Sequence, residues 1–507
     1  MSIPEDRRKF LAHSALATAG ILAAGFARGQ EPPPGPTLGK VEVPPAEKNA
    51  QQEDIKPETA KQESAKPDGP YPRFHPGLGG PIGSPSDRGK LVSGLREGGL
   101  EPVEVIAPDL QKAPWKMVNN AKEFELRAMP VRRELLPGIW MNAYGYNDLF
   151  PGPVVEVTQG DRVRIVLKNE LPEETTLHSH GMELPISMDG IPGVTQPLIK
   201  PGESFVYEFD LHQEGSYFFH PHVAMQEALG MVVPFFIHPK VAHDPVVDRD
   251  FVLVTQQFFM RPNSTVADTL SMDWNFLTIN GRSGPYTTPL VCKLGERVRI
   301  RFINFSTLHQ HPMHLHGHTF WVTGTEGGRI PESAWIPGNN VVVGVAQSRD
   351  VEFIANNPGD WVLHCHMFHH MMNHMVSQVG PIIRQKMPDP GRHVPGYPQI
   401  MQGMSNMNMK MDDIKHENMK DMPSHEGMKM DPAAGQNEYQ MKMTMEEMHK
   451  ITDRRETAGM REGWHMGVKG LFTVLRVLPP DLFHKVMDTT DPVPPNSSTP
   501  LMPHQHH

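Results

Sequence analysis

The chain has 507 residues, which is long enough for two to four domains. Its formal net charge of −10 and the lack of a basic stripe argue against a nucleic-acid partner. Two cysteines exclude a disulfide framework, whereas 28 histidines and 33 methionines supply the ligand types that bind copper in its two oxidation states.

Residues 1–29 have the features of a twin-arginine signal peptide. Residues 7–11 (RRKFL) form the basic start, an apolar stretch runs from Leu16 to Phe26, and small residues suit cleavage after Ala27. The apolar stretch is too short to span a membrane. We therefore expect a periplasmic or otherwise exported protein without a transmembrane span. The alternative is a basic N-terminus before an ordinary helix.

The composition and the apolar pattern of the sequence change at about residue 115. Residues 30–114 are rich in Pro, Glu, Lys, Gln and Gly, which is typical of a disordered linker. From 115 onward, short alternating strands are separated by Gly and Pro turns, as in residues 154–157 (VVEV) and 162–167 (RVRIVL). This pattern predicts an all-β fold.

Three blocks recur in order along this β-rich part. GDRVRI at 160–165 matches GERVRI at 295–300, an offset of 135 residues. HSHG at 178–181 matches HLHG at 314–317 (offset 136), and GSYFFHPH at 215–222 matches GDWVLHCH at 359–366 (offset 144). The repeat predicts two homologous Greek-key β-sandwich domains, 115–245 and 246–388.

The remaining chain loses the sandwich pattern. Residues 389–459 are rich in Met and His, with 13 methionines between Met401 and Met448 at spacings that follow no helical period. We predict a Met/His-rich tail here. Residues 460–507 are predicted to hold a short amphipathic helix, from Met460 to Met487 with a break at Pro479-Pro480, and a polar C-terminus.

Cys365 is the residue that points most directly to chemistry. A blue-copper site needs one thiolate, two imidazoles and a weak axial thioether. Cys365, His370 and Met375 supply three of these ligands from one strand end and its loop, and His311 is available as the fourth. Its neighbours His364 and His366 point to the opposite face of the strand from Cys365, where they can bind a different metal ion.

Four H-x-H pairs accompany this cysteine, two in each predicted domain. Both rings of each pair project to one face of a strand. Eight imidazoles in four pairs are what a three-copper cluster would use. The pairs are His178/His180, His220/His222, His314/His316 and His364/His366.

In these motifs and their order, residues 115–388 resemble the multicopper oxidases, a family that includes laccases, cuprous oxidases and bilirubin oxidases. The resemblance implies cupredoxin-like domains that bind four coppers per chain. The type 1 copper would be bound by His311, Cys365, His370 and Met375. The type 2 copper would be bound by His178 and His314. The type 3 pair would be bound by His180, His220, His222, His316, His364 and His366. Asp189 (in MDG) matches the acid that helps to deliver protons to reduced oxygen; capping a turn before Gly190 is its alternative.

The first domain lacks a type 1 site of its own. Shifting the second domain's ligands back by the repeat offsets gives Thr175, Pro221, Gln226 and Met231, of which only the methionine is kept. Electron entry is therefore expected in domain 2 alone, unlike in copper nitrite reductases. The resemblance to two-domain members further implies a head-to-tail homotrimer with three-copper clusters between subunits. The predicted final helix could pack either on the trimer or on a membrane surface, and the sequence does not distinguish these two alternatives.

The sequence thus predicts a multicopper oxidase that couples one-electron oxidation of Cu(I) or a phenol-like donor to four-electron reduction of O2 to water. The alternative is a non-enzymatic copper-sequestering protein, in which the Met-rich tail is the working part. The tail is expected to capture copper through its thioethers, and a tail with no function is the other interpretation. His318, His369 and His374 are interpreted as supporting or surface residues, and Cys292 as a buried inert thiol.

Overall fold

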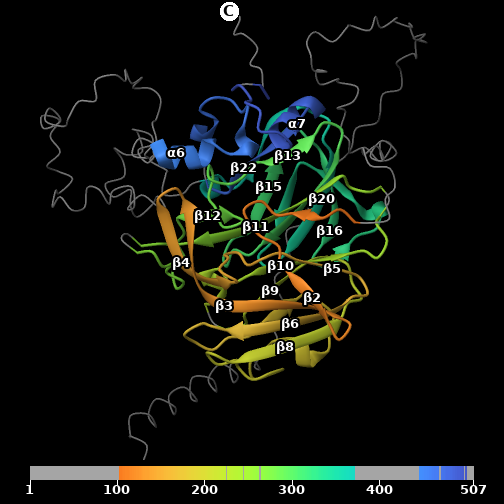
Figure 1. Ribbon diagram of the computed structural model, residues 1–507, viewed down its shortest axis with the longest axis vertical. Helices are drawn as coiled ribbons and strands as arrows, with labels where there is room; N and C mark the ends of the chain where they lie inside the picture. The colour runs from red at the N-terminus through yellow and green to blue at the C-terminus, as the bar shows by residue number, and fades with distance from the viewer. Residues whose placement is uncertain are drawn as a thin grey trace, which may run out of the picture. The chain divides into compact units, whose positions relative to one another are not determined.

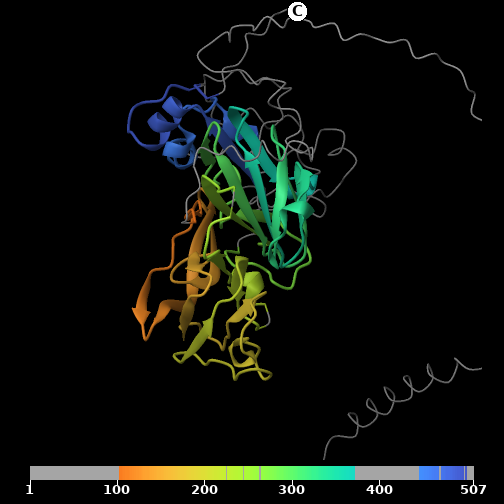
Figure 2. The ribbon, with the colours of Figure 1, turned by 90° about the vertical axis from the view of Figure 1, so that its right-hand side faces the viewer.

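The computed structural model describes residues 102–371 and 445–498, apart from residues 224, 244, 262–263, 468–469 and 496. All described residues fall within one compact unit. They form two β-sandwich domains, seen in orange to yellow and in green to blue in Figures 1 and 2. The all-β fold predicted from the sequence is confirmed.

Domain 1 contains two sheets that face each other. The first has the order β2 (Trp115–Val118), β3 (Ala121–Leu136), β6 (Arg162–Asn169), β8 (Ser204–Asp210), with β4 (Ile139–Tyr146) paired to β3. The second has the order β5 (Val155–Thr158), β10 (Val233–His238), β9 (Gly215–His220), β7 (His178–His180). Strand β7 carries the first histidine pair, and β9 ends at His220, the first member of the second pair, so this sheet positions half of the candidate ligands.

Domain 2 repeats the arrangement. Its first sheet has the order β1 (Val105–Ile106), β11 (Arg249–Phe258), β14 (Arg297–Asn304), β20 (Ser348–Ile354), β16 (Phe320–Thr325), β17 (Gly328–Arg329), with β12 (Phe276–Ile279) paired to β11 and β18 (Ile336–Gly338) to β16. Its second sheet has the order β13 (Leu290–Lys293), β22 (Phe472–Leu478), β21 (Gly359–Cys365), β15 (His311–Leu315), β19 (Asn340–Val343). The other two histidine pairs begin on β15 and β21.

Short helices lie in the connections between the strands and, in one case, after the last described strand. They are η2 (Ile186–Met188), η3 (Glu227–Leu229), η4 (Glu332–Ala334), η5 (Phe368–Met371), α6 (Met445–Thr452), η9 (Arg455–Thr457), η10 (Trp464–Gly467) and α7 (Pro480–Met487). Among the described residues, no helix combines the length and the apolar character needed to cross a bilayer.

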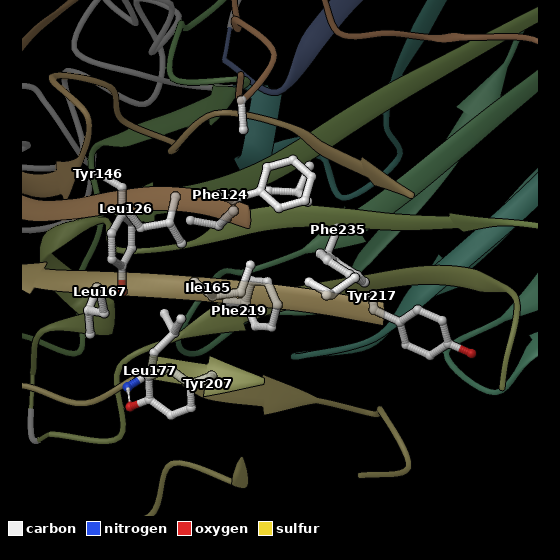
Figure 3. Packing of buried hydrophobic residues seen from close by; sticks show 14 of the residues in the cluster. Phe124, Leu126, Tyr146, Ile165, Leu167, Leu177, Tyr207, Tyr217, Phe219 and Phe235 are labelled. Atoms are coloured by element: carbon white, nitrogen blue, oxygen red, sulfur yellow. Dashed lines mark hydrogen bonds between the residues drawn. The ribbon is translucent and has the colours of Figure 1, made fainter. Parts of the chain in front are cut away.

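The core of domain 1 follows from period-two alternation along its strands. On β6, Val163, Ile165 and Leu167 are buried, whereas Arg162 is exposed and Arg164 half-buried. The buried residues meet side chains from the opposite sheet, as Figure 3 shows for Ile165 and Phe219. Each domain thus has its own apolar core.

Strand β14 of domain 2 is buried along its whole length, although its sequence is close to that of β6. One of its outward-facing arginines, Arg301, lies under domain 1. The Arg301 guanidinium donates to Ser216 Oγ of β9 at 2.8 Å and lies over the Phe236 ring of β10. A further apolar cluster joins the two domains, with Phe218 and Phe236 on one side and Ile303 and Phe305 on the other.

The chain around β22 differs from the sequence prediction. Phe472–Leu478, expected within a helix, is a strand that lies between β13 and β21 in the second sheet of domain 2. All seven of its residues are buried, so the apolar spacing that suggested a helical face comes from a strand covered on both sides. Within the described part of Met460–Met487, the helical parts are the short 3-10 helix Trp464–Gly467 and the α-helix Pro480–Met487. Domain 2 therefore does not end at residue 388, and in the sequence the Met-rich segment comes after β21 and before β22.

Two further expectations change at the boundaries. The end of the predicted linker is structured, because Val105–Ile106 pairs with β11 and Asp109 forms an ion pair with Arg282. The end of the predicted tail is structured as well, because α6 contacts the β3–β4 hairpin through the ion pair Lys450–Glu134. The signal peptide, most of the linker and the segment from 372 to 444 lie outside the described residues.

Candidate metal centres

One thiol and two imidazoles meet at the end of β21. The Sγ atom of Cys365 lies 3.4 Å from His370 Nδ1 and 3.7 Å from His311 Nδ1, and the two nitrogens are 3.1 Å apart. Pairing of β15 with β21 sets Cys365 opposite Met313, two residues from His311, and η5 brings His370 back over the strand end. All three ligand-type residues are buried.

The protonation states of this group suit a soft metal. Burial raises the pKa of the Cys365 thiol to about 12, so metal binding must displace its proton. Burial lowers the pKa of His370 to about 4 and holds that of His311 well below its usual value, which keeps both rings neutral at pH 7. Ser306 Oγ lies 2.7 Å from His311 Nε2 and leaves Nδ1 directed at the thiol. One sulfur and two nitrogens form a donor set that fits copper.

A second group lies on β7 and β9 of domain 1. His178 pairs across the ladder with His220, and the ligand atoms of His178, His180 and His220 all lie within 4.8 Å of one another. The His222 ring is 5.8 Å from that of His178. Burial lowers the pKa of His180 to about 4, so this ring is neutral at pH 7. The four imidazoles predicted for domain 1 therefore lie together.

Acidic residues adjoin these rings. The backbone oxygen of Asp189 contacts His178 Nδ1 at 2.7 Å, and its side-chain Oδ1 lies 3.4 Å from the same atom. Asp189 thus lies beside His178 of the domain 1 group. Glu227, which the sequence analysis missed, pairs with His220 Nδ1 at 2.9 Å and orients that ring.

The third group, on β15 and β21, repeats this arrangement in domain 2. His314 pairs with His364 across the ladder, and the ligand atoms of His314, His316 and His364 all lie within 4.8 Å of one another. The His366 ring is 5.4 Å from that of His314. Burial lowers the pKa of His364 to about 4. Within the part of the chain that the structure describes, no ring contact joins these histidines to those of domain 1.

The thiol group and the domain 2 imidazoles are directly connected. His364 Nδ1 lies 2.8 Å from the backbone oxygen of Cys365, the next residue. Cys365 faces the core with His311 and His370, whereas His364 belongs to the third group. Two candidate centres of different chemistry therefore lie one residue apart along β21.

Two aromatic side chains cover the ring of His370, and the sequence analysis missed both. The Trp274 ring is 5.1 Å from that of His370 and the His309 ring is 5.0 Å away. His309 stands two residues before His311, which is the one signal in the sequence that could have found it. Trp274 comes from a loop far from every motif and carried no such signal.

Three other described residues that the sequence singled out lie outside the groups. His318 is buried against Trp361 and Phe353, His369 is exposed, and Cys292 is buried in β13, where burial raises its pKa well above the usual value. Met375 and His374 lie outside the described residues.

The counterpart of the thiol site in domain 1 is closed by hydrogen bonds. Thr175 Oγ1 donates to Gln226 Oε1 at 2.8 Å, and Gln226 Nε2 donates to Glu173 Oε1 at 2.8 Å. Both Thr175 and Gln226 are fully buried. The positions that correspond to His311 and His370 are therefore adjacent, as the repeat predicted, and hold no metal-binding set.

Comparisons with known proteins agree with this geometry. Two family models described as multicopper oxidase match residues 133–242 and 259–381. Copper resistance protein A of Pseudomonas syringae pv. tomato is 30% identical over 173 residues (34% of this chain, 28% of that protein), and Laccase-2 of Cryptococcus neoformans var. grubii is 27% identical over 255 residues (41% and 42%). The match covers less than half the length of either curated relative. The blue copper oxidase structure from Nitrosomonas europaea is 29% identical with a TM-score of 0.47, over 50% of this chain and 81% of that one. Both sandwich domains of this chain belong to the multicopper oxidase family.

Proposed function

We propose that this chain is a copper-dependent oxidase that takes electrons singly from a reducing donor and uses four of them, with four protons, to reduce O2 to two water molecules. The observation that carries the proposal is the junction on β21. The thiol of Cys365 lies in one candidate centre, and its backbone oxygen contacts an imidazole of the next at 2.8 Å. A protein that only stored copper would not need such a connection.

The ligand assignments follow the three groups. His311, Cys365 and His370 are proposed to bind the type 1 copper. His178 and His314 are proposed to bind the type 2 copper. The type 3 pair is assigned to His180, His220, His222, His316, His364 and His366. Bound copper would supply the redox chemistry, namely single-electron uptake and delivery of four electrons to O2. Burial keeps the rings of His180, His311, His364 and His370 neutral. Contacts with Ser306, Asp189 and Asn339 fix the orientation of His311, His178 and His314.

Asp189 is proposed to hold and deliver protons beside the domain 1 histidines. Its carboxylate is 36% exposed and lies 3.4 Å from His178 Nδ1, so it contacts both solvent and the group. A carboxyl group in this place can take protons from water and pass them to a reduced oxygen species.

The two imidazole groups are proposed to meet between subunits of a head-to-tail homotrimer. Each domain presents four imidazoles, half of the set that the three-copper cluster uses. Domain 1 covers Arg301 on the outer face of β14, whereas the equivalent face of β6 carries the exposed Arg162. Domain 2 of a neighbouring copy would cover that face and bring the halves together.

Either a phenol-like compound or Cu(I) is proposed as the donor, since the relatives include proteins named laccase and copper resistance protein. Export through the twin-arginine signal is part of the same proposal, and it rests on residues 1–29 of the sequence.

Oxygen uptake by the copper-loaded full chain tests the proposal. Copper content is measured first, with about four ions per chain expected. Oxygen consumption is then followed with a phenol and, separately, with Cu(I); Cys365→Ser serves as the control that keeps the histidine groups. Uptake with either donor that disappears in the control supports the oxidase. A fully loaded protein that consumes no oxygen with either donor is instead a copper-sequestering protein.

A further inference from the structure

The two domains can be superimposed strand by strand around the thiol site. In domain 1, β10 runs antiparallel to β9 and parallel to β5. In domain 2, β22 runs antiparallel to β21 and parallel to β13. Strand β22 is therefore the equivalent of β10, although it lies much farther along the chain from its partner strand.

Hydrogen bonds fix the correspondence to single residues. The Met231 amide donates to the Gln226 carbonyl at 3.4 Å, and the Leu471 amide donates to the His370 carbonyl at 3.0 Å. The repeat offset already pairs Gln226 with His370. Leu471 in domain 2 therefore occupies the place of Met231 in domain 1.

The glycine before each residue supports this correspondence. Gly230 and Gly470 both have a left-handed φ, of 114° and 64°. A Cβ on Gly470 would lie 2.5 Å from the His370 oxygen, so only glycine lets the returning chain come this close to the site. Leu471 is the next residue after Gly470, so the close contact of Gly470 with His370 fixes the position of Leu471.

Met231 is the domain 1 counterpart of the axial position, because it lies ten residues after Pro221 as Met375 lies ten after Cys365. The offset that pairs Met375 with Met231 holds only if the chain after His370 in domain 2 follows the same path as the chain after Gln226 in domain 1. In domain 2, however, the strand that returns to this place begins at Leu471. The family match continues to residue 381, which keeps Met375 as the competing ligand.

We propose that Leu471, not a methionine, closes the axial side of the type 1 site. The inference rests on the proposed function. Leu471 is fully buried and bonded to both neighbours of the metal position: its amide donates to His370, and its carbonyl accepts the Cys365 amide at 3.0 Å. Its side chain belongs to the same apolar cluster as Cys365 and Met313.

An axial leucine sets the redox behaviour of the site. A thioether lone pair stabilises the more highly charged Cu(II) state, whereas an isobutyl group donates nothing and keeps the site dry, which favours Cu(I). The type 1 potential is therefore higher than an axial methionine would give. Phenols thus come within reach as donors, each giving one electron to the type 1 copper and its hydroxyl proton to solvent.

The experiment compares Leu471→Met with Met375→Leu in the copper-loaded full chain. The readouts are the blue absorption band, the electron paramagnetic resonance spectrum and the type 1 potential, titrated without oxygen against mediators. Leu471→Met should change the spectrum and lower the potential, by at least about tenfold in the electron-exchange equilibrium (~59 mV). Met375→Leu should leave all three readouts as in the unchanged protein. Met313→Leu, which removes the thioether opposite Cys365, should do the same.

A higher potential in Met375→Leu or Met313→Leu would overturn the inference and assign the axial ligand to that methionine. This result does not depend on whether Leu471→Met folds. A protein without any blue band would instead contradict the proposed function, so the two failures are distinguishable.

Discussion

Domain 1 and domain 2 fill the same site in opposite ways. In domain 2, one sulfur and two nitrogens face each other within 3.7 Å. In domain 1, the equivalent space holds the Thr175–Gln226 hydrogen bond. Buried polar atoms need partners, and the two domains supply them differently: by side-chain hydrogen bonds in domain 1 and, we propose, by copper in domain 2. The two domains thus share the strands that position these residues, but only domain 2 has side chains that can bind a metal there.

The outer faces of the two first sheets show the same contrast. Arg162 contacts Glu208 at 2.9 Å on an exposed surface, whereas Arg297 contacts Glu352 at 2.6 Å with both side chains buried. The two pairs correspond through the repeat. Residues of domain 2 itself cover the second pair: Arg297 lies over the Trp335 ring, and Arg329 forms a second ion pair with Glu352.

The largest expected effect comes from removing the sulfur that distinguishes the two sites. Cys365→Ser should abolish the blue band and donor oxidation, because a hydroxyl is a poor ligand for copper in this position. The two histidine groups do not include Cys365, so the copper that they bind should be retained in the variant. Spectroscopy combined with copper analysis checks this. A blue band in the variant would show that Cys365 does not bind the type 1 copper.

The arginine pairs can be compared directly. Arg297→Met leaves the buried Glu352 without one of its cations and should lower the free energy of unfolding by about 3–5 kcal/mol. Arg162→Met should leave the unfolding of the isolated chain unchanged within error and act on subunit association instead. Chemical denaturation and sedimentation at several concentrations separate the two effects. Equal destabilisation by both variants would contradict the burial difference.

The buried ion pairs of domain 2 should also make the stability of the protein depend on pH. Burial alone would raise the pKa of Asp250, but Arg299 and Arg301 outweigh it and lower the pKa; for Glu352, the neighbouring arginines likewise lower the pKa against burial. Their stabilisation is therefore present above the unfolded-state pKa of about 4 and is lost as pH falls through the folded values.

Stability should accordingly decline between about pH 5 and 3, and high salt should change this decline little because the groups are buried. Denaturation curves across this range measure it. In Arg297→Met the decline should be shallower, and an unchanged slope would exclude Glu352 as its source.

The histidine pairs and the repeat could be predicted from the sequence because both depend on local spacing. Alternation along a strand places both rings of an H-x-H pair on one face whatever the rest of the chain does. Strand β22 could not be predicted, because a short apolar run buried on both faces looks the same as a helical face. Its partner β21 also lies more than a hundred residues away.

The burial of the arginines was equally hidden. GDRVRI and GERVRI differ at one position, yet β6 alternates between buried and more exposed residues, whereas β14 is buried along its whole length. The covering of His370 by Trp274 arises from tertiary contact between distant segments as well. Sequence patterns therefore specified the ligand types and their strands, whereas the surroundings that tune them depended on packing.

The smallest expected effect lies at the closed site of domain 1. Thr175→Val keeps the volume of the side chain but leaves Gln226 Oε1 buried without its donor, which should cost about 1–3 kcal/mol of unfolding free energy. The blue band and its potential should not change, because the type 1 site lies entirely in domain 2. Denaturation curves and spectra of the same samples measure both quantities. If the band shifted while stability was unchanged, the two sites would be coupled through the domain contact, and the comparison between an open and a closed site would fail.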